Sequence, residues 1–192
     1  MQSNVEFVTD GSVKYHLAGN DWYAVMRDDD KVMLVDTDCE VGGEELKTRW
    51  SDGDWKSESG KNAQCILNYC NNIADTYFST IKHAIIPRTV ETGTGKLENV
   101  WMWPMSYEEF KEHKDIGGKI VRNSNGNVWT RTFSGINYHF AWYLSNASGS
   151  LNSNNYVNDV YRVAPAFYLK KSEIDHINDN GEIFLKPEDN AN

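Results

Sequence analysis

Residues 128–169 read VWTRTFSGINYHFAWYLSNASGSLNSNNYVNDVYRVAPAFYL, and this stretch decides the fold that we expect. It begins with a strand-like run at 128–133 and ends with another at 160–169, both rich in β-branched and aromatic residues. The segment between them is rich in Asn, Ser and Gly, which favour turns because they bond the local backbone or tolerate left-handed dihedral angles. The same segment also holds the large aromatic residues Tyr138, Trp142, Tyr143 and Tyr156.

Two interpretations of this middle segment stay open at the level of composition. Asn, Ser and Gly between apolar strands are typical of ordinary hairpin turns. Adaptable amide groups beside rigid aromatic rings are also typical of a binding surface built on loops, as in antibody paratopes. Composition therefore supports both a plain connection and a ligand-binding surface.

The composition of the whole chain limits the classes of function. With 192 residues, 40% of them hydrophobic and 24% charged, it is typical of one globular domain with a full core. Its net charge of −9 argues against nucleic acid or an anionic membrane as the main partner, since both are held largely by Lys and Arg. No run of about 18 apolar residues predicts membrane insertion. Residues 1–16 lack the pattern of a signal peptide.

Metal and cofactor chemistry is not predicted. The three cysteines, Cys39, Cys65 and Cys70, form neither a CxxC motif nor a disulfide framework. The five histidines stand singly, without the spacing of zinc ligands. The chain also lacks the G-x-S-x-G motif of serine hydrolases and the Gly-rich motifs of nucleotide-binding loops. We therefore expect no catalytic residues, no metal and no cofactor.

Periodicity predicts the order of the elements outside residues 128–169. Residues 22–26 and 31–35 are typical of a hairpin joined by a solvated acidic turn, and apolar residues recur at helical steps over 61–78. Further strands are expected at 5–8, 82–89, 99–103 and 182–185, a short helix at 106–113, and turns around Gly117-Gly118 and 123–127.

Two positions in or near residues 128–169 predict structural contacts. Ser106 and Glu109 have the spacing of a capping box, in which each side chain bonds the backbone N–H of the other residue. Arg131 lies in an apolar strand, where an arginine needs a carboxylate or several carbonyls as partners. We expect Arg131 to hold the fold through such a pairing, although a ligand-facing role is the alternative.

Three local motifs, in this order, resemble a family. VWMWPMSYEE at 100–109 resembles a strand followed by a capped helix in a widespread bacterial and phage domain. The W-x-R-[ST] strand follows at 129–132, then the Asn/Ser/Gly-rich region, then a closing strand with Pro165-Ala166-Phe167. The resemblance covers about residues 20–170. This family is similar to C-type-lectin-fold proteins, which include the variable proteins of diversity-generating retroelements and, more distantly, formylglycine-generating enzymes.

The resemblance implies a diversified binding surface. In the retroelement systems a reverse transcriptase rewrites a cassette at template adenines, and codons for Asn and Tyr are rich in adenine. The density of Asn and Tyr over 137–161 is similar to such a cassette. Loops on a rigid frame suit that role.

The chain departs from these relatives at several positions. The closing strand has Ala164 where the family usually has Arg before the Pro, and Arg162 lies two residues earlier. The C-terminal cysteine pair of formylglycine-generating enzymes is absent. Val157-Asn158-Asp159 only distantly resembles a calcium-dependent sugar motif.

The order of elements predicts one α+β domain over residues 1–192, with 1–18 and 187–192 peripheral, and the resemblance implies that its fold is the C-type lectin fold. Two helices would pack on mixed antiparallel sheets, followed by a long, loop-rich β region. The ligand-binding residues would be Phe133, Ser134, Asn137, Tyr138, His139, Trp142, Asn152, Asn154, Asn155, Tyr156, Asn158, Asp159 and Tyr161. Among them, Tyr138, Trp142, Tyr156 and Tyr161 are the expected anchors.

The partner that we expect is a protein or glycan on a target cell or host, with no nucleic acid and no membrane insertion. A phage particle or a bacterial cell surface is the expected location. The alternative is a structural or assembly module of a phage tail or bacterial surface protein, whose oligomeric state would distinguish it from a ligand-binding domain.

Overall fold

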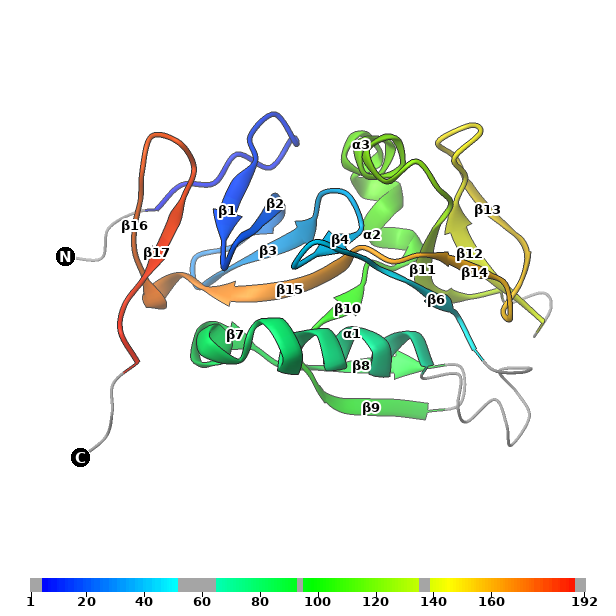
Figure 1. Cartoon of the computed structure of the whole chain (residues 1–192), viewed down its shortest axis with the longest axis horizontal. Coiled ribbons are helices and arrows are strands. Elements are labelled where there is room, and N and C mark those ends of the chain that lie inside the picture. Colours follow the sequence, from blue (N-terminus) through cyan, green and yellow to red (C-terminus); the bar gives the residue numbers. More distant parts are fainter. Residues whose placement is uncertain (1–4, 52–64, 93–94, 135–138, 189–192) are drawn as a thin grey trace.

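The computed structural model describes residues 5–51, 65–92, 95–134 and 139–188, and it shows an α+β molecule built on two main sheets. The predicted α+β class is therefore confirmed. A six-stranded sheet forms the centre of the molecule and a five-stranded sheet forms one end, which carries β12 and β13 in Figure 1. The described helices lie on either side of the central strands.

The six-stranded sheet has the order β1-β2-β3-β15-β10, with β7 also paired to β15. Its members are β1 (Tyr15–Leu17), β2 (Asn20–Arg27), β3 (Lys31–Asp36), β7 (Ile85–Ile86), β10 (Trp103–Pro104) and β15 (Pro165–Lys170). The predicted hairpin is β2–β3, and its acidic turn is closed by Asp28, whose Oδ1 accepts from the N–H groups of Asp30 and Lys31. The closing strand β15 pairs with β3 from Ala166 to Lys170.

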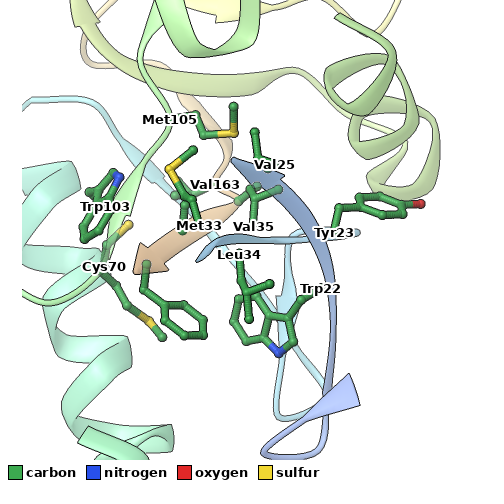
Figure 2. Packing of buried hydrophobic residues seen from close by; sticks show 14 of the residues in the cluster. Trp22, Tyr23, Val25, Met33, Leu34, Val35, Cys70, Trp103, Met105 and Val163 are labelled. Carbon is green, nitrogen blue, oxygen red and sulfur yellow. The ribbon is translucent and has the colours of Figure 1, made fainter. Parts of the chain in front are cut away.

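The hydrophobic core lies on both faces of this sheet. Every residue of β3 after Lys31 is buried, which is typical of a strand covered on both sides. Figure 2 shows Leu34 beside Trp22 on one face and Met33 and Val35 near Met105 on the other. Burial on both faces is possible because helices cover the sheet from two sides.

Helix α1 (Cys65–Tyr77) covers one face and contacts β10 and β6. It matches the helix predicted over 61–78, of which residues 61–64 lie outside the described part. Cys70 of α1 is fully buried. In Figure 1, α1 lies below β15, whereas α2 (Tyr107–Glu112) and α3 (Lys114–Ser124) lie above it.

The predicted capping box at the start of α2 is confirmed. The Ser106 side chain accepts from the Glu109 N–H at 3.1 Å, and the Glu109 carboxylate accepts from the Ser106 N–H at 2.7 Å. The turn expected around Gly117-Gly118 is wrong, because α3 runs through it. Gly117 is buried against Phe110 and Leu144, so close packing explains that glycine.

Other boundaries also differ from the prediction. The strand expected over 82–89 is divided among the end of a 3-10 helix (Ser79–Ala84), β7 and β8 (Arg88–Thr92). The strand expected over 99–103 is the end of β9 (Gly95–Val100) followed by β10. Residues 5–8 form no strand, although Phe7 is buried in the core and meets Tyr15 at 4.9 Å. In these places tertiary contacts outweigh local β propensity.

Three small two-stranded sheets complete the described structure. They are β4 (Glu40–Val41) with β5 (Glu44–Glu45), β8 with β9, and β16 (Ile174–Ile177) with β17 (Ile183–Leu185). A 3-10 turn (Lys171–Glu173) precedes β16. The strand predicted at 182–185 is thus β17. The β16–β17 hairpin contacts β1, since the His16 N–H donates to the Gly181 carbonyl at 2.9 Å. This end of the molecule lies opposite β12 and β13 in Figure 1.

Candidate functional site

The predicted ligand-binding segment lies on the five-stranded sheet, whose order is β13-β12-β11-β14-β6. Its strands are β6 (Lys47–Arg49), β11 (Val128–Phe133), β12 (Phe140–Leu144), β13 (Leu151–Tyr156) and β14 (Val160–Arg162). The pairs are antiparallel except β11–β14, which is parallel at Val128 and Arg162. β13 is an edge strand, and we call β13 with residues 157–160 the β13 rim.

A partly buried ion pair joins the sheet to α2. Arg131 of β11 donates to both carboxylate oxygens of Glu109, at 2.5 and 2.9 Å, and to the Pro104 carbonyl at 3.0 Å. Arg88 lies 3.5 Å from the same carboxylate. Burial opposes ionisation of Glu109, but the hydrogen bonds and charge of Arg131, with help from Ser106 and Arg88, hold its pKa below the ordinary 4.5. The structural role predicted for Arg131 is therefore confirmed.

A β-bulge in β13 sets the direction of the asparagine side chains. Tyr143 pairs with Asn152 and Ala141 pairs with Asn155, so two residues of β13 lie opposite Trp142 alone. The extra residue shifts the alternation of side chains. As a result, Asn152 and Asn155 both share the face of Tyr143, although they are three positions apart and would lie on opposite faces of a regular strand.

The amide side of the β13 rim rests on a cluster of three aromatic rings. The ring of Trp129 lies 4.5 Å from that of Tyr161 and 6.1 Å from that of Tyr143, between centroids. The Tyr143 hydroxyl donates to Asn154 Oδ1 at 3.1 Å, and Asn155 Nδ2 donates to the Tyr161 hydroxyl. These contacts order the amides, so their remaining donors and acceptors are presented in a defined direction.

Tyr161 is part of this cluster and is only half-buried. Burial raises the pKa of its phenol, while a hydrogen bond with Asn127 lowers it and the charge of Asp159 adds to the rise. The ring packs at a tilt against the fully buried Trp129, whose indole N–H donates to the Thr48 carbonyl at 3.1 Å. Tyr161 therefore supports the rim from below while its hydroxyl bonds Asn155.

The aromatic side of the β13 rim lies on the other face of the hairpin. Phe140 and Tyr156 are directly paired, and their rings meet edge to face at 5.0 Å. Trp142, two residues along β12, packs at 4.3 Å against Tyr107 of α2. Tyr156 has 57% of its surface exposed and Val160 has 54%, so this side presents apolar area to solvent.

The turn after β13 is anchored from beneath. Val157 is buried, its N–H donates to the His139 carbonyl, and its carbonyl accepts from the Ser51 N–H, both at 2.9 Å. The Asp159 N–H closes the turn on the Tyr156 carbonyl at 2.9 Å. Tyr156 and Asn158 are thus exposed on either side of a fixed residue, which is a rigid way to present side chains.

Over 139–161 the one Asp or Glu is Asp159, and Lys and Arg are absent. Amide groups and aromatic rings are therefore the main side-chain groups of this segment.

The structure places the predicted residues at different depths. Asn154, Tyr156 and Asn158 are exposed, and the half-buried ones are Phe133, His139, Trp142, Asn152, Asn155, Asp159 and Tyr161. Ser134 is only 2% exposed, and its N–H donates to the Phe140 carbonyl, so it lies beneath the surface and we leave it out of the site. Asn137 and Tyr138 lie outside the described residues.

The expected anchors do not share one face. Trp142 and Tyr156 lie on the aromatic side, whereas Tyr161 lies on the amide side. Sequence reasoning also missed Phe140, Tyr143 and Val160, which pack under the rim or extend it. In the sequence, only the alternation of side chains between the two faces of a strand could have placed these residues, and the bulge in β13 breaks that alternation.

The displaced arginine of the closing segment has a local partner. Arg162 pairs with Glu45 at the β5–β6 junction, and its side chain lies over Gly126, where a Cβ would come within 2.8 Å of its Nε. Ala164, two residues later, is buried in the core.

The described residues contain no group of three His, Cys, Asp or Glu side chains arranged to hold a metal ion. None of the described helices is long and apolar enough to cross a membrane. No protein-family model, curated protein or solved structure matches the chain.

Proposed function

We propose that this chain is a non-enzymatic ligand-binding domain of the C-type lectin fold, and that the β13 rim contacts its ligand. The observation that carries the proposal is the construction of this rim. Three asparagines and an exposed tyrosine stand on an edge strand whose neighbours are all fixed by packing and hydrogen bonds. Pre-ordered side chains lose little entropy on binding, so they favour affinity.

The chemistry of the rim indicates the kind of ligand. Tyr156 offers apolar area with few rotatable bonds, and the amides of Asn152, Asn154 and Asn158 offer both donors and acceptors. A protein or glycan surface rich in neutral polar groups would match it. The scarcity of Lys and Arg makes nucleic acid a poor match.

The lectin-fold part of the proposal is supported by the order of the elements. A first helix, a capped second helix, an Arg-bearing strand and a closing strand paired to an early strand occur in the sequence that the resemblance implies. The Arg131–Glu109 pair joins two of the resembling motifs directly. Each motif therefore supplies one partner of the ion pair that joins β11 to α2.

We further propose that a retroelement diversifies the rim. The exposed or half-buried positions of β13 include three asparagines and a tyrosine, whose codons are rich in adenine. Substitution there would alter the surface without disturbing the ion pair or the buried Val157. A scaffold that tolerates variation at its rim is the physical requirement for such a system.

Sequencing the DNA around the gene tests this proposal. We expect a reverse-transcriptase gene and a near-copy of the codons for residues 130–165 that differs mainly at adenines. Absence of both from the neighbouring DNA would reject diversification. The rim would then be interpreted as ordinary hairpin loops unless a ligand were found.

Changing Tyr156 to Ala tests the binding surface once a ligand has been identified. We expect affinity to fall by about 2 kcal/mol, roughly 30-fold, because an aromatic anchor is lost. Phe184→Ala is the matched control, since Phe184 is a 37% exposed aromatic residue in β17, at the other end of the molecule. Titration calorimetry should show unchanged binding for the control, and equal affinity for both variants would exclude Tyr156 as an anchor.

An assembly module remains the second candidate, and one observation favours it. The outer edge of β13 is open in the described structure, which is unusual for a six-residue strand without charge.

A further inference from the structure

The edge of β13 differs from the other ends of the two main sheets. β6 is three residues long and carries Lys47 and Arg49, and β10 has two residues. β1 is bridged by the β16–β17 hairpin through His16 and Glu182. Short, charged or covered edges resist pairing with another chain. β13 has six residues, no charge and no proline, and no described residue pairs with its outer side.

The hydrogen bonds at the two ends of β13 show how its backbone faces. The Ser150 carbonyl accepts from the Ser145 N–H, and the Val157 N–H donates to the His139 carbonyl, so both residues face the β12 side. In a regular strand, residues seven positions apart would face opposite sides. The extra residue of the bulge in β13 shifts this alternation by one position, so residues 150 and 157 face the same side. Leu151 and Tyr156, next to these two positions, therefore direct backbone groups outward.

This arrangement makes the edge symmetric about its midpoint, between Ser153 and Asn154. We propose that β13 pairs antiparallel with β13 of a second copy of this chain across a two-fold axis at that midpoint. Leu151 would lie opposite Tyr156 of the second copy, and Asn152 opposite Asn155. An isologous contact requires such self-complementarity. The Tyr156 carbonyl is engaged by Asp159, so the Tyr156 N–H and the Leu151 carbonyl form the main link at each end.

Charge favours a second copy as the occupant. Two chains of net charge −9 repel each other over most of their surfaces, but β13 carries no charge, so they can approach there. The paired side chains match in kind, apolar with apolar and amide with amide. The contact would join two five-stranded sheets into one and place two β13 rims side by side. The inference does not depend on a foreign ligand, since the β13 backbone carries it.

Sedimentation velocity on the whole chain over a dilution series tests the proposal. We expect the wild type to shift from monomer towards twice the monomer mass as concentration rises. Ser153→Lys should stay monomeric, because it places two lysines near the axis, as natural edge strands do to block pairing. Ser172→Lys is the matched control, as Ser172 is exposed in the 3-10 turn before β16 and should leave association unchanged.

Each result of the sedimentation experiment either supports or overturns the pairing of β13 with a second copy. A wild type that remains monomeric throughout the series overturns the proposal, and so does a Ser153→Lys variant that associates like the wild type. If Ser153→Lys failed to fold by circular dichroism, Ser153→Glu would be measured in its place. The dilution series uses the chain without any ligand, so a failure of self-pairing would leave the proposed ligand binding untouched, and a failure of ligand binding would leave self-pairing untouched.

Discussion

Glu109 makes three contacts at once: it caps α2 through Ser106, pairs with Arg131 and lies near Arg88. Changing it to Gln should retain the cap, since Gln also serves in a capping box, but remove the charge. Arg131, whose side chain is 12% exposed, would then lack a counter-charge. We expect a loss of about 3 kcal/mol in the free energy of unfolding, measured by urea denaturation.

Glu108→Gln is the neighbouring control. The Glu108 side chain is 71% exposed and lies 4.0 Å from Lys111, and such surface pairs contribute little. Its urea midpoint should match that of the wild type. If Glu109→Gln unfolded at the same midpoint as the control, the ion pair would not be what holds β11 to α2.

Asp36 is the opposite case, a fully buried carboxyl group that forms no ion pair with any described residue. Its Oδ2 accepts from the Glu40 N–H at 3.2 Å, while its Oδ1 has no partner among the described groups. Burial raises the pKa of Asp36 well above the ordinary 3.8, and the nearby charge of Asp38 adds to the rise. The folded state therefore holds this proton more tightly than the unfolded state.

The sign of the pH effect follows from this shift. As pH rises past 3.8, Asp36 loses its proton in the unfolded chain before it does so in the folded protein. The free energy of unfolding therefore falls as pH rises, until the raised pKa of the folded state is passed. Asp36→Asn should remove this component and reduce the loss of stability between about pH 5 and about pH 8, measured by urea unfolding. Asp29→Asn, in the exposed turn between β2 and β3, should lose as much stability between these two pH values as the wild type does. If the Asp36→Asn variant lost as much stability between these two pH values as the wild type, a group other than Asp36 would be the cause of that loss.

At the scale of elements, α3 shows why two adjacent glycines need not mean a turn. A Cβ on Gly117 would lie 3.2 Å from Phe110 Cδ1 and 3.3 Å from Leu144 Cδ1. A Cβ on Gly118 would meet only the guanidinium end of Arg122, at 3.3 Å. Gly117 thus lets the helix approach its neighbours, whereas Gly118 has no such function.

We expect Gly118→Ala to stabilise the protein by about 0.5–1 kcal/mol, because Ala favours the helix and restricts the unfolded chain. Thermal unfolding followed by circular dichroism measures the gain. Gly117→Ala, its direct comparison, should gain less or lose stability. An equal gain at both positions would mean that the helix does not need close contact at Gly117.

The β13 bulge is the second feature at this scale. Six residues, LNSNNY, fit an alternating strand as well as a turn-rich connection. The extra residue opposite Trp142 becomes visible only when β12 is placed beside β13. Neither the two sides of the rim nor its symmetric edge follows from the sequence of β13 alone.

At the scale of the whole molecule, the β13 rim and the described chain ends lie far apart. β16 and β17 occupy one end of the molecule in Figure 1, and β12 and β13 occupy the other. A partner attached near residue 5 or 188 would therefore leave the rim accessible. This geometry suits a binding domain presented on a larger assembly, as well as one that pairs through β13.

The sequence by itself determined the features that depend on neighbours along the chain. The β2–β3 hairpin, the core of α1, the capping box and the need of Arg131 for a partner all follow from local spacing and burial rules. Tertiary structure alone decided which carboxylate meets Arg131, that α3 continues through Gly117, and how the anchors divide between two faces. The physical reason is that these features depend on contacts between residues distant in sequence, whose packing outweighs the weak preferences of each segment.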